Sequence, residues 1–234
     1  MIQCNNANIG HKQALFNTGN LHLKKGQLIS LIGPNGSGKT TFFESILGQV
    51  AVLSGEILID SVKSDQMDRN FKMTTFGHVS SRFSGIEHLT IYDLIALGRA
   101  PYTNFLNRLS TDDHQLVKQI IEQLNIQHIA AKSTMAVSDG ERQIAMIGKA
   151  LAQESKVLIL DEPNAFLDYN NKRKIMELLK DLAENRSLLV LLSSHDLDLS
   201  MQYSHGIIAI DQSMKTIQRF SPAYSKEEII KRVF

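Results

Sequence analysis

The chain has 234 residues, with 25 basic against 24 acidic residues and a formal net charge of +1. A charge this close to zero produces no overall field that would attract nucleic acid, and the single cysteine, Cys4, excludes an internal disulfide. The sequence has no run of about 18 apolar residues and no apolar signal region at its start, so it predicts a cytoplasmic protein that reaches a membrane only through a partner.

The first strongly patterned segment is an apolar strand, Leu28–Ile32, followed by a glycine-rich turn and a helix over Lys39–Leu47. The turn fits the phosphate-binding pattern G-x-x-x-x-G-K-[ST]. Glycines leave the backbone N–H groups open to a β-phosphate, and the positive end of the helix points at the same anion. We expect Lys39 to contact the β- and γ-phosphates of a nucleoside triphosphate and the Thr40 hydroxyl to ligate Mg²⁺. The predicted nucleotide site comprises Gly33, Pro34, Asn35, Gly36, Ser37, Gly38, Lys39, Thr40 and Thr41.

Strand and helix patterns alternate through most of the remaining chain. Continuous apolar runs suit strands that are covered on both faces, so the pattern predicts an α/β fold with a mostly parallel sheet. The runs typical of strands lie at residues 56–59, 74–79, 157–160, 188–192 and 206–210. Helical patterns lie at residues 172–182 and after Ser225, where a capping box opens the last helix.

Residues 82–140 read differently, because they carry two helical patterns, Ile91–Gly98 and Asp112–Leu124, and no strand signal. The sequence therefore predicts a single domain whose α/β core, residues 1–81 and 141–234, contains an inserted helical subdomain at 82–140.

Two carboxylates, Asp161 and Glu162, directly follow the apolar run Val157–Leu160. Ligands of open α/β sheets bind at the edge where the strands end. We expect Asp161 to hold Mg²⁺, directly or through water, and Glu162 to act as the general base on the attacking water. The alternative is an acidic pair that merely ends a strand.

Two further segments have both a structural and a functional interpretation. Ser138-Asp139-Gly140-Glu141 opens a helix, where Ser138 is a good N-cap and Gly140 lets a phosphate approach the backbone. His195 follows the buried strand at 188–192 and is placed to sense or stabilise a γ-phosphate. The alternatives are a plain capped helix and a structural histidine.

The order of these motifs resembles that of the ATP-binding-cassette ATPases over essentially the whole chain. Gly33–Thr40 is similar to the Walker A loop, Leu158–Glu162 to Walker B, Val137–Glu141 to the signature usually written LSGGQ, and Ala165–Asp168 to the D-loop, and His195 falls at the switch histidine. The resemblance implies a P-loop NTPase core with N-terminal antiparallel strands, ATP and Mg²⁺ as ligands, and a head-to-tail homodimer or a pair with a second cassette. In that pair Ser138 and Gly140 act on the γ-phosphate held by the other subunit, while Lys39, Glu162 and His195 are the catalytic residues.

The chain also departs from the family pattern. Asp139 places an additional carboxylate in the signature, which should repel a γ-phosphate unless the side chain faces away. Ser81 stands where the family has the Q-loop glutamine, with Ser80 one residue off, and a serine reaches Mg²⁺ only through water. At the position of the tyrosine that stacks on adenine, either His11 stacks or Phe16 replaces it.

The stretch Leu89–Thr103, with its Ala-Leu-Gly-Arg-x-Pro-x-Thr, resembles cassettes that serve iron-siderophore, haem and vitamin B12 importers. That resemblance implies an importer at the cytoplasmic face of the membrane, with two permease subunits, an indirect substrate-binding protein and no nucleic acid. The exposed turn Arg99–Asn104 is then a docking surface for the permease, although the stretch could also be core packing. The alternatives are a soluble cassette ATPase acting on ribosomes, nucleic acid or cluster assembly, and a P-loop small-molecule kinase.

Overall fold

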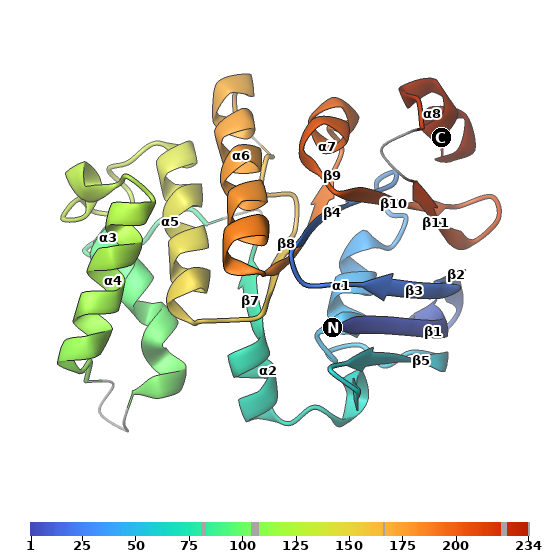
Figure 1. The fold of residues 1–234 in the computed structure, drawn as a ribbon, viewed down its shortest axis with the longest axis horizontal. Helices are drawn as coiled ribbons and strands as arrows, with labels where there is room; N and C mark the ends of the chain where they lie inside the picture. The colour runs from blue at the N-terminus through green and yellow to red at the C-terminus, as the bar shows by residue number, and fades with distance from the viewer. Residues whose placement is uncertain (81–82, 104–107, 166, 221–223, 234) are drawn as a thin grey trace.

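One twisted sheet runs through the molecule, with helices on both faces (Figure 1). The computed structural model describes residues 1–80, 83–103, 108–165, 167–220 and 224–233. Its strands are β1 (Ile2–Gly10), β2 (Ala14–Asn17), β3 (Asn20–Leu23), β4 (Gln27–Ile32), β5 (Ser54–Ile59), β6 (Val62–Lys63), β7 (Phe76–Val79), β8 (Val157–Leu160), β9 (Leu189–Ser194), β10 (Gly206–Asp211) and β11 (Thr216–Phe220). Its α-helices are α1 (Lys39–Ile46), α2 (Arg69–Thr75), α3 (Ile91–Ala96), α4 (Thr111–Gln123), α5 (Asp139–Ala152), α6 (Tyr169–Arg186), α7 (Leu197–Tyr203) and α8 (Lys226–Val233). Three 3₁₀ turns, η1 (Ser64–Gln66), η2 (Leu97–Tyr102) and η3 (Gln127–Ile129), complete the described elements.

The strands predicted from apolar runs, except the one at 56–59, form the parallel part of this sheet, in the order β10-β4-β9-β8-β7. Parallel strands need crossover connections, and α6 supplies one between β8 and β9. The other part of the sheet is antiparallel, because β1 pairs with β2, β3 and β5. The predicted α/β fold with N-terminal antiparallel strands is therefore confirmed.

Alternate residues of each parallel strand contribute to different hydrophobic clusters, as a period of two requires. On β9, Leu189 and Leu191 pack into the cluster that contains Phe42 and Ile46 of α1, and Val190 and Leu192 pack into the cluster formed with α5 and α6. These four side chains are at most 1% exposed, so each contributes about 1.5–3 kcal/mol through burial.

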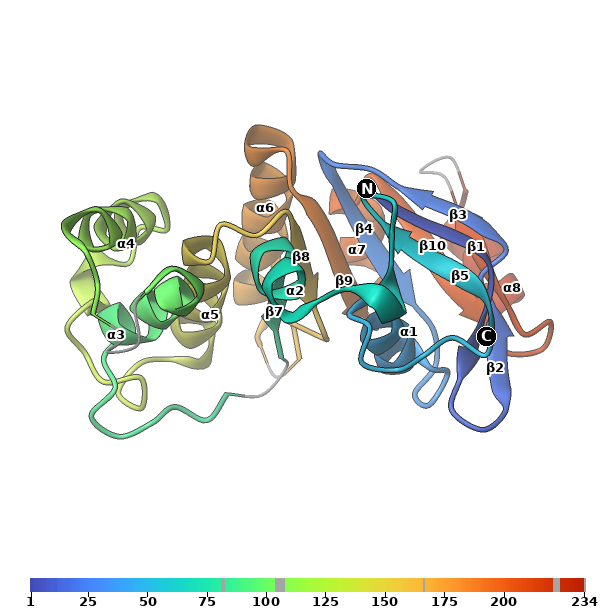
Figure 2. The ribbon, with the colours of Figure 1, turned by 90° about the horizontal axis from the view of Figure 1, so that it is seen from below.

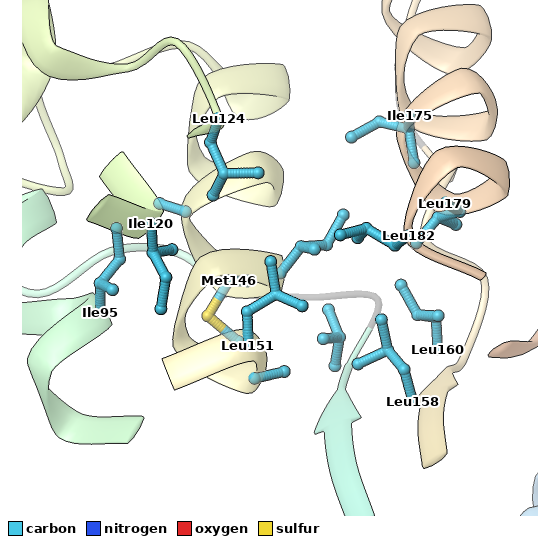
Figure 3. Close-up of a cluster of buried hydrophobic side chains, with 14 of the residues drawn as sticks. Ile95, Ile120, Leu124, Met146, Leu151, Leu158, Leu160, Ile175, Leu179 and Leu182 are labelled. Carbon is cyan, nitrogen blue, oxygen red and sulfur yellow. The ribbon is translucent and has the colours of Figure 1, made fainter. Parts of the chain in front are cut away.

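The helices α3, α4 and α5 lie beside the sheet rather than over it (Figure 2). Capping boxes begin all three helices, with Thr90, Ser110 and Ser138 as the N-cap residues. Figure 3 shows how the helices join the sheet: Ile95 and Ile120 face Met146 of α5, and the other side of α5 meets β8 and α6. The helical part and the sheet therefore share one continuous core.

Two local elements differ from the expectation. The run at 74–79 is a strand only from Phe76, because Arg69–Thr75 forms α2 with Asp68 as its N-cap. Residues Thr216–Phe220, for which no strand was predicted, form β11, an antiparallel partner of β10. Among the described residues, no helix combines the length and apolar character needed to cross a membrane.

Candidate nucleotide-binding and hydrolysis site

Three neighbouring strands deliver the predicted catalytic groups to one edge of the sheet. The loop at 33–40 follows β4, Asp161 and Glu162 follow β8, and His195 follows β9. In the sheet these strands lie in the order β4-β9-β8 and run parallel, so their carboxyl ends coincide. Residues from positions 33 to 195 of the sequence meet here for this reason.

Backbone geometry explains the glycines of the loop. Gly36 and Gly38 have φ angles of 76° and 101°, in the left-handed region where a side chain is costly. A Cβ atom on Gly33 would lie 2.7 Å from Ser37 Oγ, and one on Gly38 would lie 2.9 Å from the Phe16 ring. Ser37 Oγ is itself buried and has no hydrogen-bond partner among the described residues. The tight, side-chain-free turn and the orphan hydroxyl fit a loop that binds phosphate oxygens.

The Lys39 ammonium lies inside this loop rather than in solvent. Lys39 Nζ donates hydrogen bonds to the carbonyl oxygens of Gly33 (2.8 Å) and Pro34 (3.2 Å), and the residue is 6% exposed. Burial lowers the pKa of Lys39 below its usual value, and the carboxylates of Glu162 and Asp161 oppose this shift. A buried cation that is only partly compensated gains from an incoming anion, so its placement suits a phosphate ligand.

The Thr40 hydroxyl and the Asp161 carboxylate lie side by side at the end of the loop. Thr40 Oγ1 donates a hydrogen bond to Asp161 Oδ2 (2.9 Å), and Ser193 Oγ donates to Asp161 Oδ1 (2.6 Å). A hydroxyl and a carboxylate that touch each other form a hard oxygen donor set, which Mg²⁺ prefers. These two residues therefore fit the predicted metal position, and Ser193 orients the carboxylate.

Glu162 is held in a strained backbone conformation. Its φ is 50°, which costs a non-glycine residue of order 1–3 kcal/mol, and its N–H donates to Ser193 Oγ (2.8 Å). Its side chain reaches His195, with 2.5 Å between Oε1 and Nε2, and lies 3.9 Å from Lys39 Nζ. The Glu162 carboxylate thus contacts Lys39 and His195, the two residues that the sequence predicted to act with it. Ser193, which the sequence did not single out, holds the Glu162 backbone.

Ser193 carries a sequence signal that is weak by itself. It is a hydroxyl residue near the end of a fully buried strand, and only the pairing of β8 with β9 shows that it contacts both Asp161 and Glu162. It is 0% exposed, so both contacts are made inside the protein.

The signature residues begin α5 and form a network of their own. Ser138 Oγ donates to Glu141 Oε2 (2.8 Å), and the Asp139 carboxylate accepts from Arg142 (2.5 Å). A Cβ atom on Gly140 would lie 2.9 Å from the Asn171 side chain of α6, so packing also requires glycine there. No hydrogen bond between described residues joins Ser138 or Gly140 to the loop at 33–40.

The two candidates for adenine stacking differ in exposure. Phe16 is 1% exposed and packs edge-on against Phe42 at 6.2 Å, so its ring faces the core. His11 is exposed on the turn between β1 and β2. Leu15, which the sequence did not single out, is 40% exposed, and its Cδ1 lies 3.0 Å from the position of a Cβ on Gly38. Ser81, the expected substitute for the Q-loop glutamine, lies outside the described residues.

The Arg99 side chain is not part of an exposed docking turn. It is 8% exposed, and it pairs with Asp113 of α4 (2.7 Å) and with Glu154 after α5 (2.6 Å). Tyr102, in the same 3₁₀ turn, lies under its guanidinium at 4.1 Å. This part of the expectation was wrong for Arg99, because the arginine is an internal tie between three elements.

Comparison with known proteins agrees with the geometry. The sequence model of the protein family described as ABC transporter matches residues 16–165. The petrobactin import ATP-binding protein FpuC of Bacillus anthracis is 32% identical over 219 residues, which cover 90% of this chain and 78% of that protein. The iron(3+)-hydroxamate import ATP-binding protein FhuC of Bacillus subtilis (strain 168) is 27% identical, over 92% of this chain and 80% of that protein.

A solved structure titled as the dimeric structure of MJ0796, a bacterial ABC transporter cassette, matches with a TM-score of 0.79 at 25% identity. The match covers 96% of this chain and 100% of that one. The family match over 150 residues, the two relatives and the shared fold lead to one conclusion, which the motif order had predicted: the chain belongs to the ABC transporter family, as an ATP-binding domain that hydrolyses ATP.

Proposed function

We propose that this chain is the ATPase subunit of an importer for an iron chelate or a related cofactor such as haem or cobalamin. The observation that carries the ATPase role is the meeting of Lys39, Asp161, Glu162 and His195 at one edge of the sheet. Relatives whose names state petrobactin import and iron(3+)-hydroxamate import support the importer role.

Each residue of the site has a proposed role in hydrolysis. The loop at 33–41 binds the phosphates, and Lys39 neutralises the charge of the β- and γ-phosphates. Glu162 accepts the proton of the attacking water as the general base, while His195, in contact with Glu162, steadies the γ-phosphate. The apolar side chain of Leu15 borders the phosphate loop at Gly38, and His11, exposed on the turn before β2, is the residue proposed to stack on the base.

Thr40 and Asp161 are the proposed ligands of Mg²⁺. When bound, the ion neutralises charge on the phosphate oxygens. Ser193 keeps the Asp161 carboxylate turned toward Thr40 by restricting its rotation. One carboxylate oxygen accepts a hydrogen bond from Ser193 and the other accepts one from Thr40.

We propose that hydrolysis needs a head-to-tail pair, either two copies of this chain or this chain with a second cassette. Ser138 and Gly140 then act on the γ-phosphate bound by the partner. Each motif occurs once in the chain, and no hydrogen bond between described residues joins the signature to the phosphate loop. The pairing of Asp139 with Arg142 supports this role, because it compensates the additional carboxylate of the signature.

The chain reaches the membrane, in this proposal, through permease subunits at the cytoplasmic face, and a substrate-binding protein acts indirectly. We propose that the helical subdomain at 82–140, with the signature at its end, contacts the permease, and that residues 1–81 and 141–234 form the ATPase core. The continuous hydrophobic cluster across α4, α5 and α6 supports such coupling (Figure 3).

The test is affinity capture of tagged Glu162→Gln protein from native membranes in the presence of Mg-ATP. Loss of the general base should trap the closed pair, and mass spectrometry should then identify a permease with many spans. The wild-type protein without nucleotide is the control for retention. Recovery of soluble proteins or ribosomes without any permease would contradict the importer role.

A further inference from the structure

One buried amide near the hydrolysis site has no hydrogen-bond partner in the part of the chain that the structure describes. Asn164, two residues after Glu162, is 6% exposed, and neither its Nδ2 nor its Oδ1 has a partner among those residues. Most buried polar side chains are hydrogen-bonded, because desolvation without a partner costs free energy. An amide that leaves its donor and its acceptor without partners at once therefore indicates a binding role.

The unpartnered amide lines a small polar pocket. The pocket has a volume of about 70 Å³, and Glu162, Lys172, Ser193 and His195 line it together with Asn164. At roughly 30 Å³ for each water, such a volume holds about two water molecules. A water molecule in a protein needs two to four polar partners, and this pocket supplies both donors and acceptors.

The Glu162 carboxylate offers the second end of a water bridge. Its Oε1 contacts His195 and Lys39, and no hydrogen bond between the described residues reaches its Oε2. The backbone of Glu162 is fixed by Ser193, but its side chain has contacts on one oxygen only. Water held by Asn164 would fix the carboxylate on the other side.

We propose that Asn164 is a positioning residue that anchors ordered water in this pocket and, through it, aims Glu162 and His195 at the attacking water. This inference rests on the proposed role of Glu162 as the general base. Asn164 does not touch the nucleotide, so it affects the hydrolytic step and leaves ATP binding unchanged.

The test compares Asn164→Leu, Asn164→Thr and a matched control. Leucine keeps the approximate shape of asparagine and removes both polar atoms. The expected result is a kcat lower by about tenfold, a KM for ATP within twofold of wild type, and an equal or higher Tm because an unsatisfied buried group is removed. Asn164→Thr keeps a hydroxyl in the pocket, and we expect it to recover at least half of the wild-type kcat.

Ser200→Ala is the control, because Ser200 is also buried and has an unpartnered hydroxyl, but it lies on α7 outside the pocket. It should leave kcat unchanged. The inference would be overturned if Asn164→Leu kept the wild-type kcat. It would also be overturned if Asn164→Leu and Asn164→Thr lost kcat to the same extent and Tm to the same extent.

Glu162→Gln, measured in the same assay, separates this inference from the proposed function. If Glu162→Gln hydrolyses ATP at the wild-type rate, the general-base role is wrong and the Asn164 inference falls with it. If Glu162→Gln is inactive and Asn164→Leu is fully active, only the Asn164 inference is overturned.

Discussion

At the scale of single residues, the site depends on the buried ammonium of Lys39, whose positive charge is unfavourable in the folded protein. Lys39 has a lowered pKa because of burial, so its protonated form is less favourable in the folded protein than in water. This unfavourable free energy is offset only when a phosphate binds beside the ammonium. A substitution of Lys39 should therefore change the affinity for nucleotide without lowering the stability of the nucleotide-free protein.

The first prediction concerns Lys39→Met, which removes the charge and keeps an unbranched apolar stem. We expect ATP affinity to fall by about 100-fold, as for the loss of roughly 2–3 kcal/mol of charged hydrogen bonds, while the nucleotide-free protein keeps or raises its Tm. Titration with a fluorescent ATP analogue and thermal melts measure the two effects. Unchanged ATP affinity would refute the assignment of Lys39 to the phosphates.

The second prediction concerns Ser193→Ala, which removes the hydroxyl that bonds both Glu162 N–H and Asp161. The strained φ of Glu162 then loses its support, so we expect the ATPase kcat to fall at least tenfold and the free energy of unfolding to fall by about 1–3 kcal/mol. Urea unfolding and a phosphate-release assay measure these changes.

Ser30→Ala is the matched control, because Ser30 on β4 also makes a buried hydrogen bond, to Ser204 Oγ at 2.6 Å. It should lose stability and keep its kcat for ATP hydrolysis. A Ser193→Ala protein that loses stability but hydrolyses ATP at the wild-type rate would show that Ser193 has only a structural role.

At the scale of elements, Arg99 ties η2 to α4 and to the end of α5. The carboxylate of Asp113 also accepts hydrogen bonds from Ser110, the N-cap of α4. These hydrogen bonds, and to a smaller extent the pair with Arg99, lower the pKa of Asp113 to about 2. A depressed folded-state pKa means that the charged Asp113 stabilises the fold above the unfolded pKa near 3.8, and that this contribution is lost as the pH falls toward 2.

The third prediction follows from this sign. Asp113→Asn should be less stable than wild type at pH 7 and at pH 5, and the difference should shrink between pH 4 and pH 2. Urea unfolding at several pH values measures it. A difference that stays constant over this range would contradict the charged role of Asp113.

The fourth prediction concerns the arginine. Arg99→Met leaves Asp113 as a poorly paired carboxylate at 7% exposure, so we expect a loss of about 3 kcal/mol in the free energy of unfolding. Lys118→Met, a change at an exposed basic residue on the same helix as Asp113, is the control and should be nearly neutral. Equal stability of Arg99→Met and wild type would show that the buried pair contributes nothing.

At the scale of the whole molecule, sequence reasoning succeeded where a feature is local. The glycine turn before Lys39, the carboxylates after β8 and the capped start of α5 are each defined by neighbours in the chain, so a short segment is enough to predict them. The alternation of apolar runs with helical patterns likewise predicted the α/β fold.

Features that depend on distant contacts could not be predicted in this way. Ser193 becomes important only because β9 pairs with β8, and Asn164 becomes unusual only because α6 and the strand ends enclose it. Arg99 was expected on the surface because its segment resembles the part of importer cassettes that faces the permease. Its carboxylate partners, Asp113 and Glu154, are 14 and 55 residues away, so the local sequence does not reveal them. Burial of a charge is visible only once those partners are in place.

The central claim is that ATP closes two copies of the cassette around the site and that Glu162 then hydrolyses it. The most direct measurement is the light-scattering mass of purified Glu162→Gln protein with and without Mg-ATP, together with phosphate release. We predict a mass near the monomer value of 26.2 kDa without nucleotide, twice that value with ATP, and almost no phosphate release. A protein that binds ATP and stays at 26.2 kDa would contradict the closure of two copies and leave only pairing with a second cassette. Phosphate release at the wild-type rate would contradict the role of Glu162.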